Sequence, residues 1–148
     1  MIYKNPPENF NARFEVVSCF VEHEGEILLL HRQNNKTEGD KWGVPAGKKE
    51  ERETESEAIA REMREETGLD LHSGLFQYFD KVYVRYPDYD FVYHMFTVKL
   101  EERPNVLINE SEHKNFQWAD PQRALELNLI RDEDQCIRLF YRVHGSTA

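Results

Sequence analysis

The sequence is poor in cysteine and contains no long apolar run. Cys19 and Cys136 are the two cysteines among 148 residues, and they lie too far apart for a metal-ligand pair or a disulfide framework. We expect both to be buried thiols in a reducing compartment. No stretch approaches the roughly 18 apolar residues of a membrane-spanning helix, and residues 1–11 lack the apolar core of a signal peptide. These absences predict a cytoplasmic protein with no membrane partner.

Positive charge is also scarce. The chain has 19 Lys and Arg against 28 Asp and Glu, which gives a formal net charge of −9. An acidic surface repels phosphate backbones, so we expect no broad nucleic-acid binding. A small phosphorylated substrate is compatible with this charge because divalent cations bridge carboxylates and phosphates. The composition leaves the oligomeric state open, with a homodimer among the options.

What the chain does contain suits one globular domain over residues 1–148, with residues 1–11 as an extended N-terminal arm. Apolar, β-branched and aromatic runs predict strands at 14–21, 27–30, 76–86, 91–100 and 115–118. Helices are predicted at 54–67, 121–127 and 132–143. Strands, a central helix, more strands and then helices predict an α/β protein whose sheet is covered by helices on both faces.

The helix at 54–67 carries the most informative residues. At about 100° per residue, Glu62, Glu65 and Glu66 share one face of this helix. A second stripe, which contains Ile59 and Met63, is expected to be buried. Like charges three and four positions apart repel each other, and a bound hard cation such as Mg²⁺ would reverse that repulsion. An ordinary solvent-exposed helix face rich in charge would show the same spacing of glutamates. The residues that flank the helix are therefore needed to distinguish a metal site from such a face.

Those flanking residues complete a longer pattern. From Gly47 the chain reads GKKEERETESEAIAREMREETGL, which fits Gly-x5-Glu-x7-Arg-Glu-apolar-x-Glu-Glu-x-Gly-apolar at every fixed position. Ordinary residue frequencies give a chance match of about 10⁻⁸ per starting position. The segment 47–69 resembles the Nudix box, and the chain is similar to Nudix hydrolases in its flanking WGVPAGK segment as well.

The resemblance implies a Nudix-like α/β/α sandwich with a mixed β-sheet. It implies hydrolysis of a pyrophosphate bond, in a nucleoside triphosphate or a nucleoside diphosphate linked to another moiety, by water activated by Mg²⁺ or Mn²⁺. Arg61 would orient a ligand carboxylate, and Gly47 would let the loop pass close to the phosphate. The metal ligands carried over by position are the backbone carbonyl of Ala46 and the side chains of Glu53, Glu62, Glu65 and Glu66.

Residues outside the box complete the predicted site. The general base is expected on the loop before the strand at 115–118, with Glu112 as the first choice and Glu110, His113 or a box glutamate as alternatives. The expected substrate-binding residues are Arg32, Gly47, Lys48 and Arg85. An exposed ring from the aromatic hairpin at 76–100 would stack on a nucleobase.

Two other functions compete with hydrolysis. One is a catalytically weak nucleotide-binding or regulatory module, which the complete set of box acids disfavours. The other is isomerase chemistry on a prenyl diphosphate, which Cys19 and Cys136 are wrongly placed to support. Nucleotide-sugars, dinucleotides and capped RNA remain alternative substrates, and the number of metals and the attacked phosphorus stay open.

Overall fold

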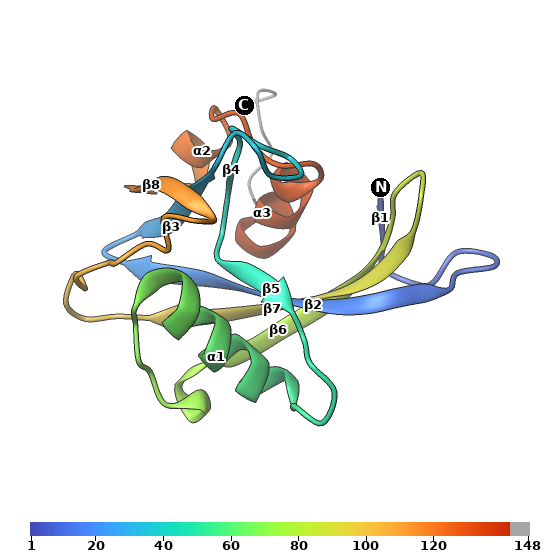
Figure 1. Cartoon of the computed structure of the whole chain (residues 1–148), viewed down its shortest axis with the longest axis horizontal. Coiled ribbons are helices and arrows are strands. Elements are labelled where there is room, and N and C mark those ends of the chain that lie inside the picture. The colour runs from blue at the N-terminus through green and yellow to red at the C-terminus, as the bar shows by residue number, and fades with distance from the viewer. Residues whose placement is uncertain (143–148) are drawn as a thin grey trace.

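A mixed eight-stranded β-sheet with helices on both faces forms the centre of the protein, as the computed structural model of residues 1–142 shows (Figure 1). Its strands are β1 (Ile2–Tyr3), β2 (Ala12–His23), β3 (Glu26–Arg32), β4 (Trp42–Gly43), β5 (Ala46–Lys48), β6 (Gln77–Arg85), β7 (Asp90–Lys99) and β8 (His113–Ala119). The helices are α1 (Glu55–Thr67), the 3₁₀ turn η1 (Ser73–Leu75), α2 (Pro121–Ala124) and α3 (Glu133–Tyr141). The predicted α/β/α sandwich with a mixed sheet is confirmed.

The long strand β2 organises the sheet. The strand order is β1-β6-β7-β2-β3-β4, with β5 also paired to β2 and β8 to β3. β2 and β7 run parallel, whereas the other pairs are antiparallel. The predicted hairpin is confirmed as β6 and β7, in which Arg85 lies opposite Asp90 beside the turn. β2 therefore has β5, which begins the box, and the hairpin as neighbours.

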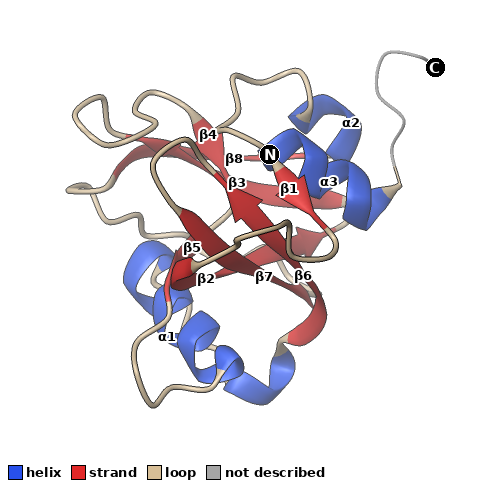
Figure 2. Ribbon diagram, turned by 90° about the vertical axis from the view of Figure 1, so that its right-hand side faces the viewer, coloured by secondary structure: helices blue, strands red, loops and turns tan. Residues whose placement is uncertain are grey.

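Alternation along β2 builds two apolar layers, one on each face of the sheet. Val17, Cys19 and Val21 belong to the layer that packs against α1. Phe20 belongs to the layer beneath α3, which also contains Cys136. Figure 2 shows α1 on one side of the sheet and α2 and α3 on the other. Both cysteines are buried and free, as predicted.

Local sequence signals fix both ends of α1. Thr54 caps the N-terminus, because its hydroxyl accepts from the Glu57 N–H at 3.1 Å and the Glu57 carboxylate accepts from the Thr54 N–H at 2.8 Å. Gly68 ends the helix in the left-handed conformation at φ 74°. The buried stripe consists of Ala58, Ile59, Ala60, Met63 and Thr67. The predicted helix and its buried face are confirmed.

The two chain ends depart in detail from the sequence prediction. The arm at residues 1–11 adds β1 to the edge of the sheet beside β6. α2 stops at Ala124 instead of 127, since the amides of Glu126 and Leu127 bond three residues back, as in a tighter 3₁₀ turn. α3 ends at Tyr141, and the predicted end at Val143 lies outside the described residues. Across residues 1–142, no helix combines the length and apolarity that a membrane crossing requires.

Candidate active site

Arg61 is the centre of an ion-pair cluster on α1. Its guanidinium donates to both oxygens of Glu53, at 2.6 and 3.0 Å, to Glu62 at 2.9 Å and to Glu65 at 3.0 Å. These carboxylates raise the pKa of Arg61, with Glu53 contributing most, so the side chain stays charged. The sequence predicted that Arg61 would hold one carboxylate, and the structure gives it three. The cluster fixes Glu53 as a support for the loop before α1, because Glu53 also accepts from the Glu50 N–H at 2.8 Å.

Gly47 lets the backbone of β5 approach the α1 carboxylates. A Cβ at this position would lie 2.1 Å from the carboxyl carbon of Glu62, far inside van der Waals contact. No other residue type can therefore occupy the position without moving the loop or Glu62. Burial raises the pKa of Glu62, and the nearby Arg61 lowers it by a smaller amount. Gly47 and the carboxylate of Glu62 therefore lie in direct contact at one side of the candidate active site.

Glu66 faces the same strand. Its carboxylate accepts from the Ala46 N–H at 3.1 Å. Burial, followed by the negative charge of Glu62, raises the pKa of Glu66 to about 8. Arg61 is engaged with the other acids, and Glu66 has no ion-pair partner among residues 1–142. Glu62 and Glu66 thus place two carboxylates against β5. Arg61, which Glu62 shares with two other glutamates, is the cation that pairs with either of them in the described part of the chain, so their negative charge is not balanced.

This donor set fits a hard divalent cation. Carboxylate oxygens are the ligands that Mg²⁺ takes in proteins, and a cation would stabilise the ionised form of Glu66. In the described part of the chain, no three acidic, histidine or cysteine side chains are already arranged around one point. Glu65 is turned towards Arg61 and is half exposed. The metal-ligand roles of Ala46, Glu53, Glu62, Glu65 and Glu66 stay predictions.

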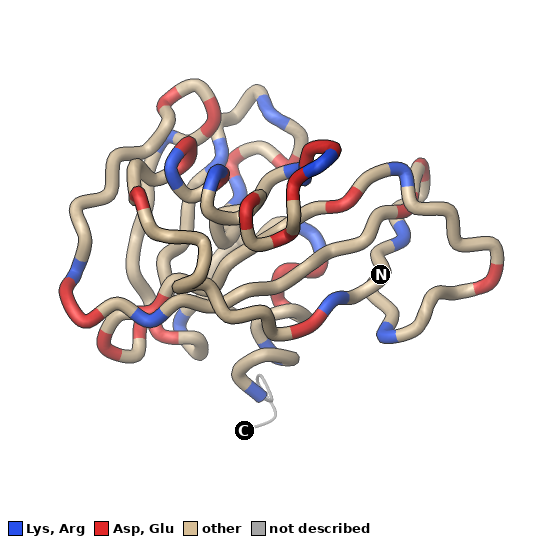
Figure 3. Tube along the Cα trace, turned by 90° about the horizontal axis from the view of Figure 1, so that it is seen from below, with Lys and Arg blue, Asp and Glu red and all other residues tan. Residues whose placement is uncertain are grey.

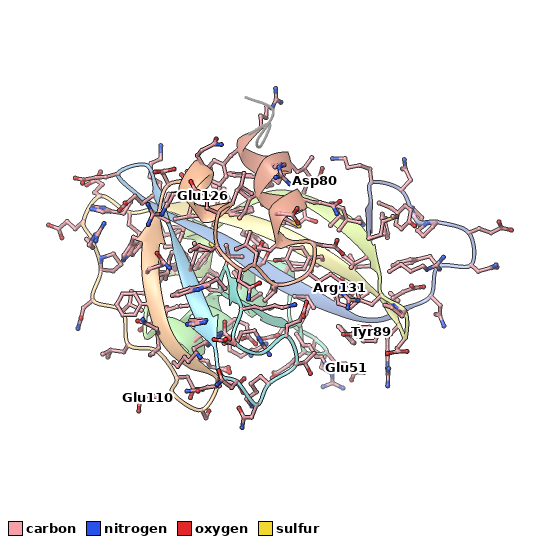
Figure 4. The ribbon with its side chains drawn as sticks, turned by 90° about the horizontal axis from the view of Figure 1, so that it is seen from above. Glu51, Asp80, Tyr89, Glu110, Glu126 and Arg131 are labelled. Carbon is pink, nitrogen blue, oxygen red and sulfur yellow. The ribbon has the colours of Figure 1, made fainter. Side chains whose placement is uncertain are left out.

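The loop before β8 supplies the candidate bases. Glu112 lies close enough for its charge to raise the pKa of Glu66, and Lys36 Nζ contacts its carboxylate at 3.3 Å. His113 is buried, and burial followed by Arg32 lowers its pKa to about 4, so it is neutral at physiological pH. The side chain of Glu110, labelled in Figure 4, is exposed on this loop. The predicted order of preference is unchanged, with Glu112 first.

A cavity of about 540 Å³ adjoins this cluster. Ala46 and Gly47 line one part of it, so the cavity reaches the β5 backbone that contacts Glu62 and Glu66. Its aromatic lining comes from β2, β7 and the hairpin turn and consists of Phe14, Tyr86, Tyr89, Phe91 and Tyr93. The cavity therefore joins an apolar, aromatic part to the β5 backbone at Ala46 and Gly47, and the α1 glutamates lie behind that backbone, outside the described lining.

Basic side chains line the cavity although the chain is acidic overall. They are Arg13, Arg32, Lys48 and Arg131. Lys48 Nζ lies 4.3 Å from the ring centre of Phe14, and Arg131 lies 4.7 Å from that of Tyr86. Figure 4 shows Arg131 and Tyr89 at the same side of the molecule. Elsewhere acidic and basic positions are interspersed along the chain (Figure 3).

The predicted substrate-binding residues divide into two groups. Arg32, Gly47 and Lys48 line the cavity. Arg85 lies outside the cavity lining, because its guanidinium binds the Asp90 carboxylate at 2.8 and 3.0 Å and the Glu8 carbonyl at 3.1 Å. This ion pair closes the β6–β7 hairpin and gives Arg85 a structural partner. The role of Arg85 as a phosphate ligand stays a prediction, and its position outside the cavity lining does not support it.

Sequence reasoning missed the residues that α3 and its preceding loop bring to the cavity. Arg131 and Glu133 stand in an ordinary polar stretch, and acids in the first turn of a helix are usually solvated partners of the helix dipole. Glu133 is instead 2% exposed, and its Oε1 accepts from the Val44 N–H at 3.0 Å. Burial raises its pKa to about 7. Spacing along the chain gives no signal for this position.

Comparison with known proteins finds a family match, two similar sequences and a similar solved structure. The sequence matches the family description "NUDIX domain" over residues 12–140. It is 28% identical over 134 residues to the CTP pyrophosphohydrolase of Escherichia coli strain K12, which covers 89% of this chain and 94% of that protein. It is 30% identical over 137 residues to the uncharacterized Nudix hydrolase YvcI of Bacillus subtilis strain 168, which covers 88% of this chain and 80% of that protein. The crystal structure of a MutT protein from Methanosarcina mazei Go1 superposes with a TM-score of 0.75 at 25% identity, over 87% of this chain and 93% of that one.

Proposed function

We propose, from the premise that this chain belongs to the Nudix hydrolase family, that it hydrolyses a pyrophosphate bond of a single nucleotide, with nucleoside triphosphates as the preferred class. The observation that carries the proposal is the cavity that runs from the aromatic side chains to Gly47. Its aromatic part suits a base, and its other end lies against the acidic cluster, where a diphosphate would be held. The similarity to a CTP pyrophosphohydrolase over nearly all of that protein's length supports the same class.

The size of the cavity favours one nucleotide over two. Small-molecule sites usually enclose roughly 300–1,000 Å³, and about 540 Å³ lies in the lower half of that range. A dinucleotide would have to leave its second base outside the cavity. The proposal therefore ranks triphosphates above dinucleotides by cavity size, and above nucleotide-sugars by the similarity to a CTP pyrophosphohydrolase.

Each part of the site has a role in this reaction. Phe14, Tyr89 and Phe91 would enclose the base, and Arg32 and Lys48 would bind phosphate oxygens. Arg61 holds its three glutamates in place through hydrogen bonds. Glu62 and Glu66, with the Ala46 carbonyl, would hold Mg²⁺ or Mn²⁺, and the ion when bound supplies positive charge beside the diphosphate and lowers the pKa of water.

Glu112 would complete the reaction as the general base. A carboxylate beside the cluster can accept the proton of the water that attacks phosphorus, and the bond between that phosphorus and the bridging oxygen then breaks. No covalent intermediate with the protein is required. Glu112→Gln should lower kcat far more than it changes KM.

The test is a substrate panel with product identification. Nucleoside triphosphates, nucleotide-sugars, a dinucleotide and capped RNA are incubated with the protein, with and without Mg²⁺. The expected result is Mg²⁺-dependent turnover with the highest kcat/KM on a triphosphate. Exclusive turnover of dinucleotides would contradict the proposal, and nucleotide binding without turnover would favour a regulatory module.

A further inference from the structure

The loop between β3 and β4, residues 33–41, is bound to the loop that carries Glu112. The Gln33 N–H donates to the Glu112 carbonyl at 3.0 Å. The side-chain amide of Gln33 donates to the Glu110 carbonyl at 2.8 Å and to the His113 carbonyl at 3.3 Å. One glutamine therefore binds the backbone of Glu112 and of residues on both sides of it, and it fixes where the Glu112 side chain begins.

A second set of contacts joins the same two segments at Lys114. Its Nζ donates to Oδ1 of Asn34 at 2.6 Å and to Oδ1 of Asp40 at 2.7 Å. Asp40 also contacts Nε2 of His31 at 3.0 Å, and the His31 ring stacks on Trp42 with ring centroids 4.2 Å apart. The loop of the candidate base is therefore attached to the β3–β4 loop at several points, and the β3–β4 loop is attached to the two strands that it connects.

The β3–β4 loop is tightly folded. A Cβ on Gly39 would lie 2.5 Å from the Asn34 carbonyl oxygen, so the two ends of the loop are in close contact. Glu38 and Asp40 lie in the left-handed region, at φ 56° and 60°. Non-glycine residues persist in this conformation only where the surrounding structure holds them. A loop folded in this way can give a fixed position to the residues bound to it.

Lys36 is the residue of this loop that reaches the Glu112 carboxylate. Its Nζ lies 3.3 Å from Oε1, and the two side chains are 32% and 39% exposed. An ion pair at this exposure contributes little to stability, so its effect is chiefly on where the carboxylate points. Among residues 1–142 the carboxylate makes this one hydrogen bond. Lys36 therefore holds one oxygen and leaves Oε2 able to accept a proton.

The same loop also lines the cavity, through Thr37 and Glu38. The Thr37 carbonyl accepts from Arg32 Nε at 2.8 Å, and Arg32 is itself a lining residue. The Glu38 carboxylate accepts from the Arg131 N–H at 2.7 Å. The loop that holds Glu112 therefore also holds Arg32, the side chain assigned above to phosphate oxygens.

We propose that Gln33 and Lys36 are positioning residues for the general base: Gln33 fixes the backbone of Glu112, and Lys36 orients its carboxylate so that Oε2 receives the proton of the attacking water. Neither residue touches the reacting atoms. A displacement of about 1 Å at a reacting group costs about a hundredfold in rate, so partial loss of either contact should lower kcat with little change in KM. The inference rests on the proposed function, because it requires Glu112 to act as the base.

Four variants separate positioning from stability. Lys36→Met keeps an unbranched side chain without the cation, and Lys36→Arg keeps a cation within reach of Oε1. Gln33→Ala removes the side-chain donor and keeps the N–H that binds the Glu112 carbonyl. Glu112→Gln removes the base itself. Lys4→Met is the matched control, since Lys4 Nζ pairs with Asp80 at 2.8 Å on the surface and Lys4 lies outside the cavity lining.

Steady-state kinetics with Mg²⁺ and the preferred nucleotide give kcat and KM for each variant. Glu112→Gln should lower kcat by about a hundredfold or more. Lys36→Met and Gln33→Ala should each lower kcat by about tenfold with KM within about threefold, and Lys36→Arg should keep kcat within about threefold of the wild type. Lys4→Met should match the wild type in kcat. Thermal unfolding of each variant ensures that kcat is compared between folded proteins.

The decisive measurement is the double variant that combines Lys36→Met with Glu112→Gln. If Lys36 acts through Glu112, adding Lys36→Met to Glu112→Gln should change kcat by less than about twofold. Losses that multiply in the double variant, or a wild-type kcat in Lys36→Met, would overturn the role of Lys36. A raised KM at unchanged kcat in Gln33→Ala would overturn the role of Gln33. Failure of the proposed function looks different, because the wild type would then hydrolyse no nucleotide or Glu112→Gln would keep the wild-type kcat.

Discussion

At the scale of single residues, Gly47 shows how one missing side chain sets the site. The backbone of β5 approaches Glu62 so closely that any Cβ would overlap its carboxyl group. The box pattern predicted a glycine at this place, and the structure supplies the physical reason. Glycine is required at position 47 by the contact with Glu62 and not by backbone conformation, since the φ of Gly47 lies outside the left-handed region.

We predict that Gly47→Ala lowers kcat by about a hundredfold or more, because a Cβ 2.1 Å from the Glu62 carboxyl carbon must displace Glu62 or the loop by about 1 Å. Overpacking should cost about 1–3 kcal/mol of stability. Steady-state kinetics and urea unfolding measure the two effects. Gly25→Ala is the control: Gly25 has φ 81° with nothing within 4 Å of its Cβ position, so it should lose stability without losing activity. Equal activity in both variants would contradict the account.

Glu133 gives a second prediction at this scale, on the pH dependence of stability. Burial, and to a smaller extent Asp134, raises its pKa from 4.5 to about 7. The folded protein therefore holds this proton more tightly than the unfolded chain does. The cost of ionising the group is absent below the unfolded pKa and fully present above the folded one.

Stability contributed by this group should thus fall as the pH rises from about 4.5 to about 7, by at most about 3 kcal/mol. Glu133→Gln cannot ionise, so the difference in unfolding free energy between variant and wild type should shift in favour of the variant over that window. Urea unfolding of both proteins at pH 5 and pH 8 measures the shift. A difference that does not change with pH would show that Glu133 titrates normally.

At the scale of elements, α1 is both a structural helix and the holder of the acids. Thr54 and Gly68 fix its ends, and its buried stripe fixes its rotation about its axis, so the acidic face is presented to β5. Arg61 then converts three repelling carboxylates into a network. The guanidinium fork is essential, because a lysine offers one point charge to three partners.

We predict that Arg61→Lys lowers kcat by about tenfold to a hundredfold, since Glu62 and Glu65 lose their fixed donor. Thr54→Ala is a matched control on the same helix: it removes the capping box and should cost about 1 kcal/mol of stability with kcat unchanged. Comparison of kcat with the unfolding free energy separates the two variants. A proportional loss of activity in both would mean that Arg61 acts only through helix stability.

α1 was also the element that the sequence predicted best, and the reason is local. Its caps, its buried stripe and its acids all lie within one run of residues, so spacing alone specifies them. The hairpin shows the opposite case. Arg85 looked like a free cation in the sequence, but the β6–β7 register places it opposite Asp90. Which residues face each other across a turn depends on register, and no local pattern specified the turn geometry of this hairpin.

At the scale of the whole molecule, the cavity is assembled from distant parts of the chain. Phe14 on β2, Tyr93 on β7 and Glu133 on α3 meet only because β2 and β7 run side by side and α3 packs across them. The aromatic hairpin at 76–100 was predicted as the place of a nucleobase, and its rings line the cavity, but no sequence pattern joins them to Phe14 and Glu133. The acidic part of the site could be predicted from the sequence, because a single motif at residues 47–69 contains all of its glutamates.

The N-terminal arm also belongs to this scale. β1 pairs with β6, and Ile2 lines the cavity. We predict that deletion of residues 1–4 raises KM for the preferred nucleotide several-fold and leaves kcat within about twofold, because the acidic cluster is untouched. Ile2→Ser tests the same wall without the loss of strand pairing. A fall in kcat with unchanged KM would show that the arm supports the catalytic loop instead.

The measurement that tests the central claim most directly is a crystal structure with Mg²⁺ and a non-hydrolysable triphosphate analogue of the preferred nucleotide. The account predicts the base among Phe14, Tyr89 and Phe91, the phosphates beside Gly47, and an ion held by Glu62 and Glu66. A nucleotide bound elsewhere, or phosphates at Gly47 with no ion between them and these glutamates, would contradict it.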